Sequence, residues 1–280
     1  MGAATGGWKA DPVAERIEID GVTFAYEDTG GEGPNVLILH GLGGSANGWL
    51  AQLEASRERG WRGIAPDQRG AGSSDRSPGP YSVDLWAEDA VRLLDALDIE
   101  SAALVGHSVG SMIAAQAAQR LGERAWALAL CGGIMRWPDS AGAVFAERAR
   151  LARTGRTDEI AEAVAASGLS KACRDRDPRL LGLMREAIAA NDGESYARWA
   201  EATAEGRIEG LEGLDCPLLA FCGSEDPVTP PAVSEQIAAA APRGRAAVVE
   251  GAAHWCLIED PEGTARTLFA FLDQHAPTSR

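Results

Sequence analysis

Short apolar runs alternate with helix-forming segments along most of this chain of 280 residues. Runs such as 36–39 and 102–105 are apolar throughout and stop at glycine-rich or polar turns, which is typical of strands buried on both faces of a parallel sheet. The segment 82–97 instead repeats apolar residues at helical spacing behind Ser82, which can cap a helix. This alternation predicts an α/β fold with a doubly wound, mostly parallel sheet.

We expect eight strands in this sheet. Two short strands with a turn at Asp20-Gly21 lie within 16–29, and the other six lie at 36–39, 61–66, 102–105, 125–130, 218–222 and 246–249. The helices that connect or follow these strands are expected at 46–59, 82–97, 109–121, 232–240 and 262–274.

The alternation stops between residues 137 and 208, where no strand is convincing. Four helices are expected there instead, at 141–153, 157–167, 178–190 and 194–205. We therefore predict an α/β core made of 1–136 and 209–280, with a helical cap (lid) at 137–208 inserted between two strands. Such an insertion commonly covers a site at the carboxyl ends of the strands. Residues 1–14, rich in glycine and alanine, are expected to be flexible.

The chain carries 26 Lys and Arg against 41 Asp and Glu, a formal net charge of −15. This balance argues against nucleic-acid binding, which depends on cations that neutralise phosphates. The five cysteines are scattered without a C-x-x-C pair, which disfavours zinc ribbons and predicts reduced thiols in a cytoplasmic protein. Its apolar runs are too short for a membrane span or a secretory signal. The composition leaves open whether the protein forms a homo-oligomer.

A G-x-S-x-G motif, Gly106-His107-Ser108-Val109-Gly110, lies between a predicted strand and a predicted helix. The motif alone arises often by chance. A strand, turn and helix in this order, however, are the setting of a nucleophile elbow, a sharp turn that exposes a serine. The flanking positions of such a turn must be small, and Gly106 and Gly110 satisfy this requirement. We therefore predict that Ser108 is a nucleophile.

A serine hydroxyl needs a base to take its proton, and the base needs a carboxylate that fixes its tautomer. Two histidines follow Ser108: His254, in a loop between the last strand and the last helix, and His275, near the end of the chain. Asp226 follows the penultimate strand, where its carboxylate can reach His254, and its neighbour Glu225 has a weaker claim. We therefore predict a catalytic triad of Ser108, Asp226 and His254.

Attack on a carbonyl also needs two backbone N–H groups that stabilise the developing negative charge. We expect these from Val109, which follows the nucleophile, and from Leu42, in the turn 40–44. Four large side chains near these loops or in the cap are candidates for substrate binding: Met135, Trp137, Trp199 and Trp255. The aromatic residues among them could instead pack the cap onto the core, which is at least as good an explanation for Trp199.

Five segments together resemble the α/β-hydrolase family: 40–44, 67–74, 106–110, 223–227 and 253–255. The resemblance covers roughly residues 16–275 and is nearest to enol-lactone hydrolases and aminoacrylate-type hydrolases with a helical lid. It implies the order Ser, Asp, His along the chain. It also implies hydrolysis of an ester or lactone of a small molecule through an acyl-enzyme, without a metal or a cofactor. The loop 67–74 would then be structural, and its Arg69 would not be catalytic.

Three alternatives stay open. Gly41-x-Gly43-x-x-Ala46 follows a strand, with Asp67 about 20 residues on, and so also fits a dinucleotide-binding fingerprint. Carbon–carbon hydrolases of the meta-cleavage type keep a serine and a His-Trp pair like His254-Trp255, although they tend to carry Asn at the position of His107. A small-molecule receptor that retains a complete triad would share all of these residues.

Overall fold

The computed structural model describes residues 15–277 and contains a sheet with the strand order β1-β2-β4-β3-β5-β6-β7-β8. β1 (Glu15–Ile19) pairs antiparallel with β2 (Val22–Asp28), and β2 pairs antiparallel with β4 (Arg62–Pro66). All other neighbours are parallel, and the remaining strands are β3 (Asn35–Leu39), β5 (Ala102–His107), β6 (Ala125–Cys131), β7 (Leu218–Gly223) and β8 (Gly244–Val249). The predicted eight-stranded, mostly parallel sheet is confirmed.

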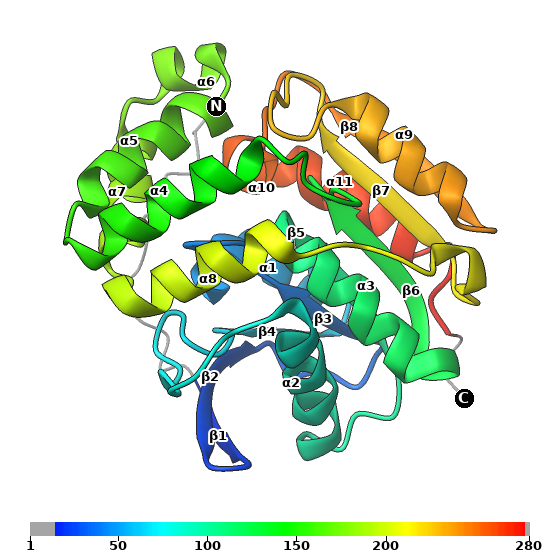
Figure 1. Cartoon of the computed structure of the whole chain (residues 1–280). Helices are drawn as coiled ribbons and strands as arrows, with labels where there is room; N and C mark the ends of the chain where they lie inside the picture. Colours follow the sequence, from blue (N-terminus) through cyan, green and yellow to red (C-terminus); the bar gives the residue numbers. More distant parts are fainter. Residues whose placement is uncertain (1–14, 278–280) are drawn as a thin grey trace.

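Helices cover both faces of the sheet, as its doubly wound order requires (Figure 1). Buried residues of α2 (Val83–Ala96), α3 (Val109–Leu121) and α9 (Pro231–Ala240) form one apolar cluster with the sheet. Buried residues of α1 (Leu50–Glu58) and α11 (Pro261–Leu272) form a second. Along β3, Leu37 and Leu39 join the first cluster, whereas Val36 and Ile38 join the second, because successive side chains of a strand point to opposite faces.

The order of the strands reverses beside β3. The chain passes from β3 to β4 on one side and then returns to β5 on the other. In open α/β sheets, ligands bind at such a switch point, outside the carboxyl ends of the strands. The turn 40–44 and Ser108 follow β3 and β5 directly, so the fold brings both to this edge.

Five α-helices lie between β6 and β7, although these two strands are neighbours in the sheet. They are α4 (Ala141–Arg153), α5 (Thr157–Gly168), α6 (Lys171–Arg176), α7 (Arg179–Ala189) and α8 (Gly193–Glu205), and Figure 1 shows them gathered on one side of the molecule. Buried residues of α4, α5, α7 and α8, among them Phe145 and Ile160, form an apolar cluster of their own. The chain enters and leaves this insertion at one place, where Arg136 and Arg207 form an antiparallel bridge.

Several short elements were not predicted. The expected helix at 46–59 begins as the 3₁₀ helix η1 (Ala46–Trp49), and α6 is an additional helix in the insertion. Further short helices are η2 (Gly122–Arg124), η3 (Leu211–Gly213) and α10 (Cys256–Glu259). Residues 1–14, which were expected to be flexible, lie outside the described residues. Within 15–277, no helix combines the length and the apolar character that a membrane span requires.

Candidate active site

Ser108 occupies a strained turn between β5 and α3. Its φ of 55° and ψ of −122° are unusual for a residue with a side chain. A Cβ atom at Gly106 would collide with the backbone oxygen of Gly110, and one at Gly110 would collide with that of Leu39. The turn can therefore close only with glycine on both sides. Ser108 is half-buried at the carboxyl end of β5, as an elbow requires.

The turn 40–44 lies against this elbow. A Cβ atom at Gly41 would lie 3.1 Å from the Cβ of Ser108. His40 supports the turn, because its Nδ1 donates to the carbonyl oxygen of Gly41 at 2.9 Å and its Nε2 accepts from the N–H of Gln68 at 3.0 Å. Burial lowers the pKa of His40, which agrees with a neutral, structural imidazole. Leu42 belongs to this turn, so the two segments expected to supply oxyanion donors meet at Ser108.

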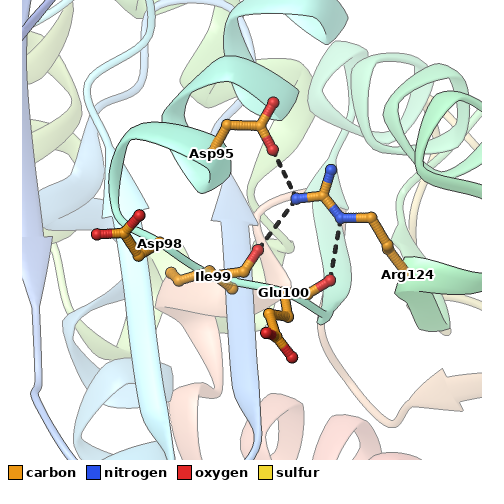
Figure 2. Close-up of a pocket in the computed structure, with 5 residues that line it drawn as sticks. All are labelled: Asp95, Asp98, Ile99, Glu100 and Arg124. Atoms are coloured by element: carbon orange, nitrogen blue, oxygen red, sulfur yellow. Dashed lines mark hydrogen bonds and ion pairs between the residues drawn. The ribbon is translucent and has the colours of Figure 1, made fainter.

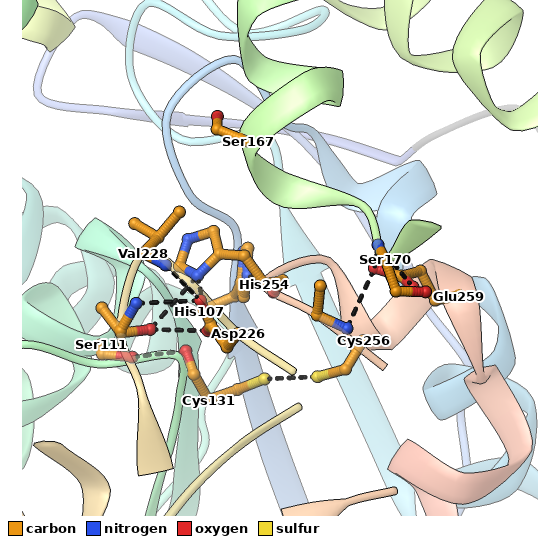
Figure 3. A network of polar contacts seen from close by, with 12 residues as sticks. His107, Ser111, Cys131, Ser167, Ser170, Asp226, Val228, His254, Cys256 and Glu259 are labelled. Atoms are coloured by element: carbon orange, nitrogen blue, oxygen red, sulfur yellow. Dashed lines mark hydrogen bonds and ion pairs between the residues drawn. The ribbon is translucent and has the colours of Figure 1, made fainter. Parts of the chain in front are cut away.

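His254 and Asp226 are joined by a buried hydrogen bond of 2.9 Å from Nδ1 to Oδ2 (Figure 3). Their exposed fractions are 6% and 3%. Asp226 also accepts bonds from the N–H groups of Val228 and Thr229 on Oδ1, at 2.8 and 2.9 Å, and from the hydroxyl of Thr229 on Oδ2, at 2.7 Å. These bonds occupy the carboxylate and fix its orientation. The nitrogen of His254 that remains for proton transfer is Nε2.

The pKa of Asp226 lies below its ordinary value. Burial raises it, but the hydrogen bond and the charge of His254, together with the two bonds from Thr229, outweigh burial. Asp226 is therefore a carboxylate at neutral pH and can hold the Nδ1–H tautomer of His254.

A second histidine, His107, lies beside His254 but is unsuited to proton transfer. Its Nε2 donates to the carbonyl oxygen of His254 at 2.8 Å. Burial, and then the neighbouring His254, lower the pKa of His107 to about 3. His107 is thus neutral and holds the backbone of the residue predicted to be the base.

The family follows from a comparison of the whole sequence. A family model described as the alpha/beta hydrolase fold matches residues 34–261. The chain belongs to the α/β-hydrolase fold family. The resemblance that its motifs indicated is confirmed, and the protein is a hydrolase.

Individual members of the α/β-hydrolase family are similar over most of the chain. A protein of Escherichia coli O9:H4 (strain HS) named "Putative carbamate hydrolase RutD" is 29% identical over 239 residues, which cover 82% of this chain and 88% of that protein. A thermophilic esterase from Thermogutta terrifontis superposes with a TM-score of 0.87 at 28% identity, covering 94% of this chain and 100% of that one. The enol-lactonase from Burkholderia xenovorans LB400 gives a TM-score of 0.85 at 28% identity, covering 92% and 100%.

Trp199, predicted as a candidate for substrate binding, is 2% exposed. Its ring stacks on Trp86, with 3.6 Å between ring centroids, and its Nε1 donates to the carbonyl oxygen of Arg69 at 2.9 Å. These are contacts of a side chain that packs α8 onto the core, so the packing explanation accounts for Trp199.

The other three candidates for substrate binding are half-buried. The carbonyl oxygen of Met135 accepts a bond from Ile208, at the entrance to the insertion. Trp137 contacts Phe145 edge-on, with 5.1 Å between ring centroids. Trp255 lies 5.0 Å from His107, measured between ring centroids. Trp255 is thus beside the Asp226–His254 pair, while Met135 and Trp137 lead into the inserted helices.

The dinucleotide alternative conflicts with the contacts of Asp67. Its Oδ1 accepts from the N–H of Ala46 at 2.9 Å, and its Oδ2 accepts from the N–H of Ser73 at 2.8 Å. Both oxygens therefore hold loops of this α/β-hydrolase and are not free for a ribose. In the same loop, Arg69 forms two hydrogen bonds with Asp89, of 2.7 and 2.6 Å, which agrees with the expected structural role of this loop.

Sequence reasoning missed two residues that contact the Asp226–His254 pair or its loop. Thr229 lies three residues after Asp226 and contacts both members of the pair, at 2.7 Å from Asp226 Oδ2 and 3.2 Å from His254 Nδ1. An aspartate followed by a threonine at this spacing is a common side-chain-to-backbone turn and was a signal for it. Glu259 accepts from the N–H of Ala253, the residue before His254. Nothing in its sequence context sets this glutamate apart.

A surface hollow at the opposite edge of the sheet is unrelated to this site. It is lined by Asp95, Asp98, Ile99, Glu100 and Arg124 (Figure 2). These residues precede β5 and β6, whereas Ser108 follows β5. The guanidinium of Arg124 already binds Asp95 and two backbone oxygens, so the described residues that line the hollow offer no free cation.

Proposed function

We propose that this α/β-hydrolase is a serine hydrolase that cleaves an ester or a lactone of a small, partly apolar molecule. The observation that carries the proposal is the buried bond between His254 and Asp226, at the same edge of the sheet as the strained turn of Ser108. A strained, half-exposed serine at the same edge of the sheet as an imidazole whose Nδ1 is bound by a carboxylate is the arrangement that nucleophilic catalysis needs.

In the proposed mechanism, Ser108 Oγ attacks the carbonyl carbon of the substrate while His254 Nε2 takes the hydroxyl proton. Asp226 stabilises the imidazolium that forms, and the N–H groups of Leu42 and Val109 stabilise the oxyanion. Collapse of the tetrahedral intermediate breaks the ester bond, and His254 protonates the departing alcohol oxygen. A water activated by His254 then attacks the acyl-enzyme and releases the acid.

The inserted helices would act as a cap that shapes the substrate. Met135, Trp137 and Trp255 are apolar and partly exposed, which supports a partly apolar ligand. The acidic balance of the chain supports a small molecule rather than a nucleic acid as the partner. The buried, free cysteines support an enzyme of the cytoplasm.

A hydrolysis panel tests the proposal. It contains p-nitrophenyl esters, simple lactones, β-keto enol-lactones and a carbamate, the last because of the similarity to a protein named for that activity. We expect turnover of an ester or lactone, and a loss of kcat of about 10⁶-fold in Ser108→Ala. Ser167→Ala is the matched control, since within residues 15–277 that exposed hydroxyl bonds only to its own helix. A meta-cleavage carbon–carbon substrate is assayed beside the panel. Cleavage of that substrate alone, or ligand binding without turnover, would favour the alternatives.

A further inference from the structure

Glu259 places a carboxylate in the interior, between the inserted helices and the loop of His254. Its exposed fraction is 6%. Its two oxygens accept from the N–H of Ser170 at 3.2 and 3.1 Å, and Oε1 also accepts from the N–H of Ala253 at 3.2 Å (Figure 3). Among residues 15–277 no ion pair involves this carboxylate, and Arg176 donates to the backbone oxygen of Glu259 instead. A buried anion without a cation partner is costly unless hydrogen bonds satisfy it.

The backbone of His254 is held on three sides. The N–H before it, that of Ala253, donates to Glu259. Its own carbonyl oxygen accepts from His107 at 2.8 Å. The N–H after it, that of Trp255, donates to the carbonyl oxygen of Gly168 at 3.1 Å. Two of these three bonds connect the loop to residues 168–170 of the insertion. The N–H of Trp255 bonds directly to Gly168, and the N–H of Ala253 is connected to Ser170 through Glu259.

Only a small residue fits at position 168, where the end of α5 meets the loop 253–255. A Cβ atom at Gly168 would lie 2.6 Å from Cδ1 and 2.8 Å from Nε1 of Trp255. The link between α5 and α6 is thus in direct contact with the loop of His254. Close packing and two hydrogen-bonded connections make the link and the loop one unit.

We propose that Glu259 is a positioning residue for the hydrolytic reaction. It holds residues 168–170 of the insertion and the loop 253–255 in one fixed arrangement, and thereby sets the position of His254. The proposal rests on the proposed function of His254 as the base. It follows that this part of the insertion is fixed in the catalytic state, and that a substrate enters past other inserted helices.

A carboxylate suits this place because the two backbone groups that it contacts are both donors. The N–H groups of Ser170 and Ala253 come from different segments, and a carboxylate offers acceptors to both. A glutamine has one oxygen, which at the position of Oε1 can still accept from both N–H groups. Its NH₂ group then takes the position of Oε2, 3.1 Å from the nitrogen of Ser170, where two donors face each other. Glu259→Gln therefore weakens the connection to Ser170 with almost no change in volume.

The first experiment compares Glu259→Gln with Asp260→Asn. The neighbouring Asp260 accepts from the N–H of Gly263 and caps α11, away from the loop of His254. Active sites are counted with a fluorophosphonate, and kcat and KM are measured with p-nitrophenyl acetate. We expect Glu259→Gln to lower kcat per active site about tenfold or more, with KM changed less than twofold. Asp260→Asn should keep kcat within twofold. A merely structural role would reduce the number of active sites, not kcat per site.

The second experiment removes the N–H group of Ser170, which donates to Glu259. Ser170 has a φ of −62°, and Leu169 before it is extended, so proline fits at position 170. Ser170→Ala removes only the hydroxyl that caps α6, whereas Ser170→Pro removes the N–H as well. We expect Ser170→Pro to lower kcat at least about threefold below Ser170→Ala, and this difference to vanish in the Glu259→Gln background.

These outcomes separate the two proposals. Equal kcat in Ser170→Pro and Ser170→Ala, or equal kcat in Glu259→Gln and Asp260→Asn, would overturn the role of Glu259. If Glu259→Gln does not fold, the two Ser170 variants decide. Retained turnover in Ser108→Ala would overturn the proposed function itself, whatever the Glu259 variants do.

Discussion

Asp226→Asn replaces one carboxylate oxygen by an amide NH₂ group in the middle of the candidate site. Oδ1 of Asp226 accepts two backbone N–H groups, at 2.8 and 2.9 Å. Only an oxygen can accept both, so the amide oxygen must stay there. The NH₂ group then takes the position of Oδ2, 2.9 Å from His254 Nδ1. The orientation of the new side chain is fixed by the backbone.

In that orientation the NH₂ group donates toward Nδ1. His254 must then carry its proton on Nε2, because Nδ1 has to accept. An imidazole protonated on Nε2 cannot take the proton of Ser108. Loss of the correct tautomer in a serine triad costs about 10⁴-fold in kcat, or about 5.5 kcal/mol of transition-state stabilisation. We therefore expect Asp226→Asn to lower kcat by about this factor.

The assay is kcat for an ester hydrolysed by the unchanged enzyme, with the melting temperature measured in parallel. The two backbone bonds persist in Asp226→Asn, so Tm should fall by only a few degrees. A loss of kcat smaller than about 30-fold in a folded variant would refute the reasoning. It would mean that another acid, such as the exposed Glu225, orients His254, or that Asp226 does not set its tautomer.

Three further predictions concern the surroundings of the site. Gly106→Ala should destabilise the fold by about 3 kcal/mol or more, measured by urea denaturation, because its Cβ would collide with the backbone oxygen of Gly110; an unchanged midpoint would contradict the strained turn. Thr229→Val should lower the free energy of unfolding by about 2 kcal/mol at pH 7, since the buried Asp226 carboxylate loses a bond of 2.7 Å; a change below about 0.5 kcal/mol would show that this bond contributes little. The pKa of His107 is lowered to about 3, so the unfolded state binds more protons below about pH 6.5, and stability falls with falling pH. His107 alone should account for a loss of about 2.5 kcal/mol between pH 6 and pH 4, and a His107→Asn variant with the same slope of unfolding free energy against pH would disprove this origin.

The sheet and its helices could be predicted because each element carries its own signal. The runs at β3 and β5 are apolar throughout, and α2 has a capping serine and a periodic apolar face. The start of β8 could not be predicted. It lies at the edge of the sheet, its first residues are Gly244 and Arg245, and its pairing with β7 defines it rather than an apolar pattern. The same holds for α6, whose six residues are too few to show a helical period.

The predicted triad residues stood out because each follows a strand of the sheet. Strand order then brings them to one edge, without help from the inserted helices. The contacts that hold the site could not be predicted in this way. Glu259 and Ser170 are 89 residues apart, and only the packing of the insertion onto the core brings them together. For Trp199, the sequence was compatible with binding and with packing, and its contact with Trp86 distinguishes the two.

The most direct test of the account is to trap the acyl-enzyme. The protein is mixed with a p-nitrophenyl ester, quenched in acid before turnover is complete, digested and examined by mass spectrometry. We predict the mass of one acyl group on the peptide that contains Ser108, and no adduct in Ser108→Ala. An acyl group on a different residue, or turnover in Ser108→Ala at the unchanged rate, would contradict the central claim that Ser108 is the nucleophile of this α/β-hydrolase.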